Sequence, residues 1–143
     1  MLPQTAEYAL RAVVHLVDSS EAPRTSRQIA KGTKVPAGYL YKVLQKLVAA
    51  GLIRSQPGPN GGYALQRPPA QITVLDVVNA VEPVQRIHTC PLGLASHGER
   101  LCPLHRELDN ACAVIEASFA KVTIAQILSR ETTSPPLRDL IRK

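Results

Sequence analysis

The segment TSRQIAKGTKVPAGYLYKVLQKLVAAGLIRSQPGPNGGYAL, residues 25–65, decides the fold. It opens with a Thr-x-x-Gln capping pattern at Thr25 and Gln28, which predicts a short helix that ends at Gly32. A second helix is predicted over residues 36–50, because it begins with a proline, carries apolar residues at helical spacing and is followed by a glycine. Two such helices joined by a short link form either a helix-turn-helix motif or an ordinary helical hairpin.

The residues behind these helices help to decide between the two. Residues 52–56 are predicted to form a strand, residues 57–62 a Pro- and Gly-rich loop, and residues 63–66 the returning strand. A helix-turn-helix followed directly by such a hairpin is a winged helix. Glycines at the tip of the wing lack Cβ, so the backbone there is able to approach a sugar–phosphate wall closely.

Helical patterns flank this unit on both sides. An apolar stripe predicts a first helix over residues 4–18, and Thr73, with Asp76 three positions later, is expected to cap a further helix. The predicted fold class is mainly α with a small β-hairpin wing. Residues 1–67 would form a winged helix-turn-helix domain, and residues 68–143 a sensor loop and a long dimerisation helix.

The excess positive charge lies in the first half of the chain. The net charge is +6, and residues 1–67 hold nine Lys or Arg against three Asp or Glu, whereas residues 68–143 hold eight of each kind. A basic module beside a neutral one is typical of a polyanion-binding domain joined to a domain with another role. A merely soluble basic face is the plainer interpretation.

Recognition of double-stranded DNA needs a helix that fits the major groove and groups that bind phosphates. The second motif helix, the start of the helix before it and the wing supply such groups. The candidate DNA-binding residues are Thr25, Ser26, Arg27, Tyr39, Tyr41, Lys42, Lys46, Arg54, Asn60 and Gly61. Single-stranded nucleic acid is disfavoured, because four Tyr and one Phe are the only aromatic residues and offer no stacking platform.

A heptad pattern dominates residues 101–122. Apolar or small residues recur at spacings of three and four, as in a coiled-coil seam. They are Leu101, Leu104, Leu108, Ala111, Ile115, Ser118 and Val122. Few apolar surfaces remain in so small a chain to cover this stripe, which favours a two-fold homodimer over packing within the protomer. A palindromic operator is the expected partner of such a dimer.

No segment has the pattern of a secretory signal, and no apolar run approaches the roughly 20 residues that span a bilayer. A cytoplasmic protein without membrane association is expected. Its three cysteines, Cys90, Cys102 and Cys112, are an odd set. A disulfide scaffold is therefore disfavoured, and metal, redox or core roles remain. Cys112 is expected to be a buried hydrophobe.

Several stretches carry a resemblance to one family. They are EYALRA at 7–12, GYL at 38–40, GPNGGYAL at 58–65, RPP at 67–69, ITVLDVV at 72–78 and VTIA at 122–125. Together they resemble the winged-helix transcription regulators that include IscR, NsrR and RirA. The resemblance covers roughly residues 1–130. It implies a homodimeric repressor or activator, not an enzyme, that senses redox, nitric oxide or iron status through an iron–sulfur cluster in the loop before the dimer helix.

The resemblance also implies a ligand set for that cluster. Cys90 matches the first ligating cysteine of the family. Cys102 matches the last, because it begins a Cys-x-x-His step with His105. Glu7 matches an acidic position of the first helix that in some members ligates the partner subunit's cluster. The chain departs from the family pattern in the middle, since none of the eleven residues between the two cysteines is a cysteine and His97 stands in that region.

Two thiolates with histidine or carboxylate ligands favour a [2Fe–2S] centre over a [4Fe–4S] centre. The same donors also suit a tetrahedral Zn²⁺ ion or a bare thiol switch. Two other functions therefore stay open. One is a cluster-free winged-helix regulator that responds to thiol oxidation or another ligand. The other is a small zinc metalloenzyme, which is disfavoured because no general base stands at a recognisable spacing.

Overall fold

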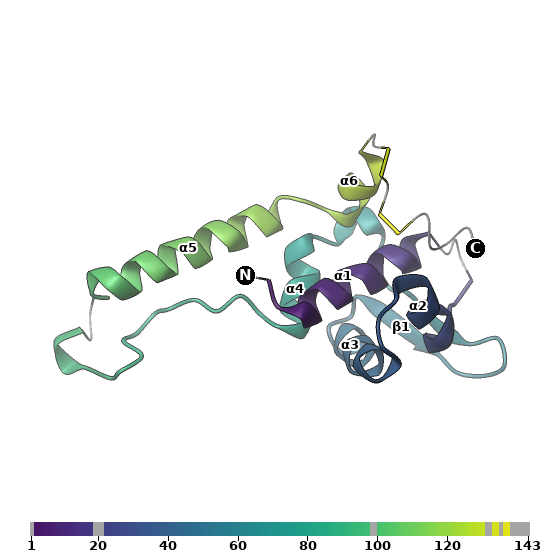
Figure 1. The fold of residues 1–143 in the computed structure, drawn as a ribbon, viewed down its shortest axis with the longest axis horizontal. Helices are drawn as coiled ribbons and strands as arrows, with labels where there is room; N and C mark the ends of the chain where they lie inside the picture. The colour runs from purple at the N-terminus through teal and green to yellow at the C-terminus, as the bar shows by residue number, and fades with distance from the viewer. Residues whose placement is uncertain (1, 19–21, 98–99, 131–132, 135, 138–143) are drawn as a thin grey trace.

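The computed structural model describes residues 2–18, 22–97, 100–130, 133–134 and 136–137. Three helices and a hairpin form one end of the molecule (Figure 1). They are α1 (Gln4–Val17), α2 (Ser26–Thr33), α3 (Ala37–Ala49), β1 (Ile53–Gln56) and β2 (Gly62–Leu65). The apolar faces of these elements and of the helix over residues 74–81 form one continuous buried core. This core contains Val13, Leu44 and Val77. The predicted winged helix-turn-helix is confirmed.

The first helix of the motif begins as predicted but does not end as predicted. Thr25 and Gln28 form the capping box, with hydrogen bonds of 2.9 and 3.2 Å between the side chain of each and the backbone N–H of the other. The predicted end at Gly32 is wrong, because the helix continues one residue past it and Lys34 takes the left-handed conformation instead, with φ 55°. Gly32 has another role, since a Cβ there would overlap the imidazole ring of His15 on α1.

The wing is joined to the segment that leads into α2. β1 and β2 pair antiparallel, with Ile53 opposite Leu65. Beyond this ladder, Arg24 and Tyr63 exchange backbone hydrogen bonds of 2.7 and 2.9 Å. Gly62 permits the contact, because its φ is 144° and a Cβ at this position would overlap the backbone of Arg24. The sequence pattern did not predict this link between the wing and the helix-turn-helix.

The part of the chain that follows the next helix extends away from this end and then returns to it (Figure 1). α4 (Val74–Val81) packs against α1 and α3, and α5 (Pro103–Ala120) leaves the body beyond it. We call α5 and the segment between α4 and α5 the arm. α5 is shorter than the predicted seam, because Leu101 precedes it and Val122 follows it. Within the described ranges, none of the helices has the length and apolar content needed to cross a bilayer.

Two capping boxes lie where the arm joins the rest of the molecule. Thr73 caps α4 as predicted, and Thr123 caps α6 (Ile124–Ser129). The residues around the two threonines form an antiparallel bridge, with backbone hydrogen bonds of 2.8 and 2.9 Å. The chain therefore returns from α5 to the point where α4 begins.

An ion pair holds the segment between α4 and α5 against α5. Nε and Nη2 of Arg86 lie 2.7 and 2.9 Å from the two carboxylate oxygens of Asp109, and the N–H of Ile87 donates to the same carboxylate at 2.8 Å. These contacts hold the pKa of the Asp109 carboxyl well below its usual range. Arg86 also reaches Glu116 at 3.4 Å.

Candidate DNA-binding surface and cysteine–histidine pairs

The exposed side of α3 carries side chains that were predicted to contact DNA. Its apolar residues at helical spacing, Leu40, Val43, Leu44 and Leu47, are at most 1% exposed. Tyr41, Lys42 and Gln45 lie on the exposed side. In a helix-turn-helix, a second helix that is held by its apolar face and presents polar groups on the other is typical of a recognition helix.

Tyr39 on α3 contacts α1. The centroid of its ring lies 6.2 Å from that of Tyr8, and the guanidinium carbon of Arg11 lies 5.4 Å from the centroid of the Tyr8 ring. Both distances fall in the range of aromatic and cation–π contacts. Tyr39 is nevertheless 60% exposed, so that its ring remains accessible to a ligand while α1 limits its position.

The start of α2 presents Thr25, Ser26 and Arg27 to solvent. The capping box already uses the backbone N–H groups of Thr25 and Gln28. The N–H groups of Ser26 and Arg27 belong to the first turn, where no carbonyl of the same helix precedes them. They are the ones suited to a phosphate oxygen.

Lys46 differs from the other predicted contacts. It lies on α3, but its ammonium nitrogen donates a hydrogen bond of 3.0 Å to the carbonyl oxygen of Val81 at the end of α4. In this structure Lys46 ties α3 to α4. Lys46 would have to lose this hydrogen bond in order to contact a phosphate. Among the described contacts, Lys42 has no such hydrogen bond to lose.

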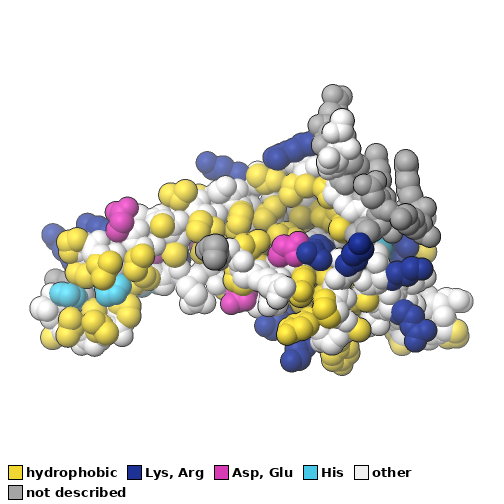
Figure 2. Space-filling view, viewed as in Figure 1, with side chains coloured by type: hydrophobic (Ala, Val, Ile, Leu, Met, Phe, Trp, Pro, Cys, Tyr) yellow, Lys and Arg dark blue, Asp and Glu magenta, His cyan; other side chains and the backbone are white. Residues whose placement is uncertain are grey.

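The wing carries the remaining predicted contacts. Asn60 is exposed at its tip, and the N–H of Gly61 donates to the carbonyl of Gly58 at 3.0 Å, which closes the turn. Arg54 donates to the carbonyl of Leu65 at 2.8 Å, so its guanidinium is held against the hairpin. Figure 2 shows Lys and Arg side chains at the end of the molecule that holds α2, α3 and the wing.

The arm holds two cysteine–histidine pairs. Sγ of Cys90 lies 3.8 Å from Nδ1 of His97, and Sγ of Cys102 lies 3.4 Å from Nδ1 of His105. Cys90 is buried, and Cys102 is the N-cap residue of α5. Histidine and apolar side chains share the far end of the arm in Figure 2. The structure therefore pairs four of the five predicted metal ligands, two by two.

The fifth predicted ligand is elsewhere. Glu7 lies on α1, where its carboxylate accepts a hydrogen bond of 2.7 Å from Nε of Arg11. In the part of the chain that the structure describes, no three His, Cys, Asp or Glu side chains come close enough to hold a metal ion. Cys112 lies on α5 and is half-buried rather than fully buried as expected.

Sequence reasoning missed the contacts that join distant segments. The pairing of Arg24 with Tyr63, the ion pair of Arg86 with Asp109 and the contact of Gly32 with His15 leave no periodic trace in the sequence. The sequence predicts that Gly32 ends α2, and this prediction is wrong, because the helix ends at Thr33. A charged pair 23 residues apart is visible only once the fold brings the two segments together.

A helix-turn-helix joined to its wing, a basic face and a separate arm define a winged-helix DNA-binding regulator. The chain belongs to the Rrf2 family, because the family model described as an iron-dependent transcriptional regulator matches residues 2–130. The family predicted by resemblance is confirmed. Since this is a family of transcriptional regulators, the zinc enzyme considered above is set aside.

Individual relatives agree with this assignment. An HTH-type transcriptional regulator of Aquifex aeolicus (strain VF5) is 27% identical over 130 residues, which cover 89% of this chain and 90% of the relative. The structure of CymR, the global cysteine regulator of B. subtilis, has a TM-score of 0.72 at 23% identity and covers 92% of this chain and 98% of its own. IscR of T. potens has a TM-score of 0.73 at 21% identity, with 94% and 93% covered. At these identities the two solved structures show the fold alone.

Proposed function

We propose that the protein binds a palindromic operator as a homodimer, through α3 and the wing of each protomer, and senses redox, nitric oxide or iron status through an iron–sulfur cluster near Cys90 and Cys102. The observation that carries this proposal is the position of the two cysteine–histidine pairs. One pair lies in the segment before α5 and the other at the start of α5. A change at the thiols therefore acts directly on the helix that carries the heptad seam.

The exposed seam of α5 supports the dimer. This helix contains no buried residue in the protomer. Leu104, Leu108 and Ile115 are 64%, 50% and 42% exposed, and the small residues Ala111 and Ser118 belong to the same seam. Burying apolar surface contributes roughly 25 cal/mol per Å², so a second copy of α5 on this stripe stabilises both protomers. The arm extends from the body (Figure 1), which leaves room for such a partner.

The donor types in the arm fit a [2Fe–2S] centre. Each pair combines one thiol with one imidazole, and mixed thiolate and imidazole ligands occur on [2Fe–2S] clusters. Four ligands require that both pairs, Cys90 with His97 and Cys102 with His105, come together, or that three of these side chains come together and Glu7 of a second protomer completes the set. When bound, the cluster would supply the redox- and nitric-oxide-reactive centre. The family description, which names iron-dependent regulators, also supports a cluster here.

A cluster-free thiol switch is a second candidate, and one contact favours it. Cys102 stands at the N-terminus of α5, 3.4 Å from the imidazole of His105. Cys102 is only half-buried, so its sulfur, the atom that oxidants attack, remains partly accessible.

Anaerobic purification followed by iron and sulfide analysis tests the proposal. We expect visible absorbance and bound iron in the wild-type protein and in Cys112→Ala. Both should be absent in Cys90→Ala and Cys102→Ala, since each substitution removes a thiolate. Wild-type protein that is colourless and iron-free after anaerobic reconstitution would reject the cluster and leave the thiol switch.

A further inference from the structure

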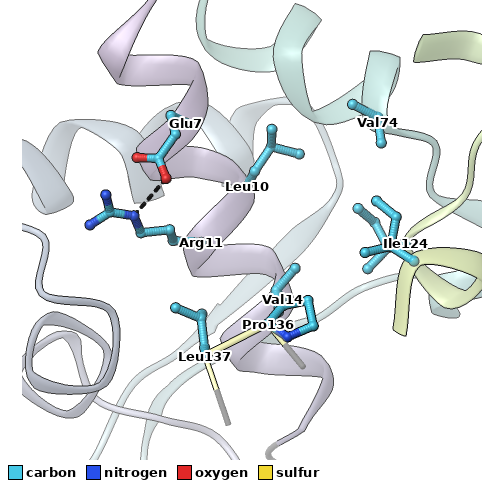
Figure 3. Close-up of a pocket in the computed structure, with 9 residues that line it drawn as sticks. Glu7, Leu10, Arg11, Val14, Val74, Ile124, Pro136 and Leu137 are labelled. Atoms are coloured by element: carbon cyan, nitrogen blue, oxygen red, sulfur yellow. Dashed lines mark hydrogen bonds and ion pairs between the residues drawn. The ribbon is translucent and has the colours of Figure 1, made fainter. Parts of the chain in front are cut away.

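A pocket of about 340 Å³ lies beside α1, away from the cysteines (Figure 3). Residues from α1, α4 and α6 and from the segment after α6 line it. They are Glu7, Leu10, Arg11, Val14, Val74, Ile124, Ile127, Pro136 and Leu137. The volume lies at the lower end of the range of about 300–1,000 Å³ that ligand pockets occupy. The occupant is therefore a small molecule.

The pocket is apolar except at one place. Figure 3 shows Glu7 and Arg11 together on α1, on one side of the pocket, with Val74 and Ile124 on the other. Leu10 lies between them. A ligand in this space meets aliphatic side chains over most of its surface and a charged pair at one end.

Arg11 determines which polar group suits that end. Its Nε donates to Glu7 at 2.7 Å, and its Nη1 donates to the carbonyl of Thr33 at 3.1 Å. A guanidinium carries five N–H donors. Three therefore remain without a protein acceptor among the described residues, and the Arg11 side chain is one-third exposed. Guanidinium N–H donors beside an apolar wall suit an anionic acceptor, and a carboxylate supplies one.

We propose that this pocket binds a small monocarboxylate with an apolar body, and that this ligand is an input to the regulator separate from the thiols. The carboxylate binds the free side of Arg11, and the apolar body contacts Leu10, Val14 and Ile124.

The contacts of Arg11 connect the pocket to the helix-turn-helix. Besides the carbonyl of Thr33 at the end of α2, Arg11 contacts the ring of Tyr8, which in turn contacts Tyr39 on α3. A carboxylate bound on the free side of Arg11 therefore shares its guanidinium with contacts to α2 and, through Tyr8, to α3. Ligand binding should therefore change the affinity for DNA, and DNA should change the affinity for the ligand by the same factor.

Calorimetric titration of the protein with octanoate tests the site, with 1-octanol as the uncharged probe of the same chain length. We expect saturable binding of one octanoate per chain and at least tenfold weaker binding of 1-octanol. Arg11→Met should weaken octanoate more than tenfold and leave 1-octanol nearly unchanged. Arg106→Met, at an exposed site on α5, is the matched control and should bind octanoate as the wild-type protein does.

Ile127→Phe fills the pocket without removing a contact of Arg11, and it should weaken both probes. This second variant keeps the test decisive if Arg11→Met unfolds. Any of three results would overturn the proposal: no saturable binding of octanoate, equal affinity for the two probes, or unchanged octanoate affinity in both pocket variants. DNA binding and visible absorbance, measured without octanoate, report separately on the function proposed above.

Discussion

The ammonium nitrogen of Lys46 on α3 lies 3.0 Å from the carbonyl oxygen of Val81, the last residue of α4. The last carbonyl groups of a helix have no partner within the helix, and a cation placed there is stabilised. The contact therefore joins the predicted recognition helix to the helix from which the arm begins. A displacement of the arm has a direct physical route to α3.

This contact distinguishes Lys46 from Lys42, which lies one turn earlier on α3. Lys42→Met should flatten the dependence of log DNA affinity on log salt concentration by about one unit, because it removes one phosphate contact. Lys46→Met should leave that slope nearly unchanged and lower the free energy of unfolding by about 1 kcal/mol, since it removes a charged hydrogen bond. Fluorescence anisotropy at several salt concentrations and urea denaturation measure the two effects. If Lys46→Met flattens the slope as much as Lys42→Met, Lys46 leaves Val81 for a phosphate when DNA binds.

The seam on α5 is tested by two exposed aliphatic residues. Leu108→Glu places a charge in the proposed two-fold contact, so it should give monomers and lose binding to a palindromic duplex. Val114→Glu is the control, because Val114 is 70% exposed on the same helix but lies outside the heptad seam. It should remain dimeric. Light scattering measures both molar masses, and a folded Leu108→Glu dimer would show that another surface dimerises.

Gly32 and Gly38 should respond to alanine in opposite directions. Gly32→Ala places a methyl group against the ring of His15, and it should lower the free energy of unfolding by about 1–3 kcal/mol. Gly38→Ala meets no atom within 4 Å and should raise it by about 0.4–1 kcal/mol, because alanine restricts the unfolded chain. Urea denaturation of the two variants gives both values. Equal stability of Gly32→Ala and wild type would mean that α1 and α2 separate easily.

His15 should make stability depend on pH. Its side chain is 3% exposed, and burial together with the charge of Arg24 lowers its pKa, while Asp18 opposes this shift. The unfolded chain takes up a proton near pH 6.5 and the folded chain only at lower pH. The free energy of unfolding should therefore be highest above pH 6.5 and fall below it, by at most about 1.4 kcal/mol per pH unit.

Denaturation of His15→Phe at the same pH values measures this contribution. The aromatic ring keeps much of the packing and removes the proton, so most of the decline below pH 6.5 should disappear. His88→Gln changes an exposed histidine and should keep the decline. Identical pH profiles for wild type and His15→Phe would assign the decline to other groups.

Local patterns in the sequence predicted the local structure. The capping boxes at Thr25 and Thr73 and the wing are confirmed, because each depends on residues close together in the chain. The spacing of Cys102 and His105 likewise places the two side chains in contact. Tertiary contacts could not be predicted in this way. The apolar periodicity of α3 predicts which of its side chains are exposed. It does not predict that Lys46 donates to a carbonyl oxygen 35 residues away.

The most direct test of the account compares DNA affinity with and without the cluster. A duplex selected from a random pool by the wild-type protein is titrated anaerobically with iron-reconstituted protein and with the same protein after iron removal. We predict at least a tenfold difference in affinity between the two forms, for the wild-type protein and for Cys112→Ala, and no difference for Cys90→Ala or Cys102→Ala. Equal DNA affinity of the reconstituted and iron-free wild-type protein would contradict the claim that a cluster in the arm controls DNA binding.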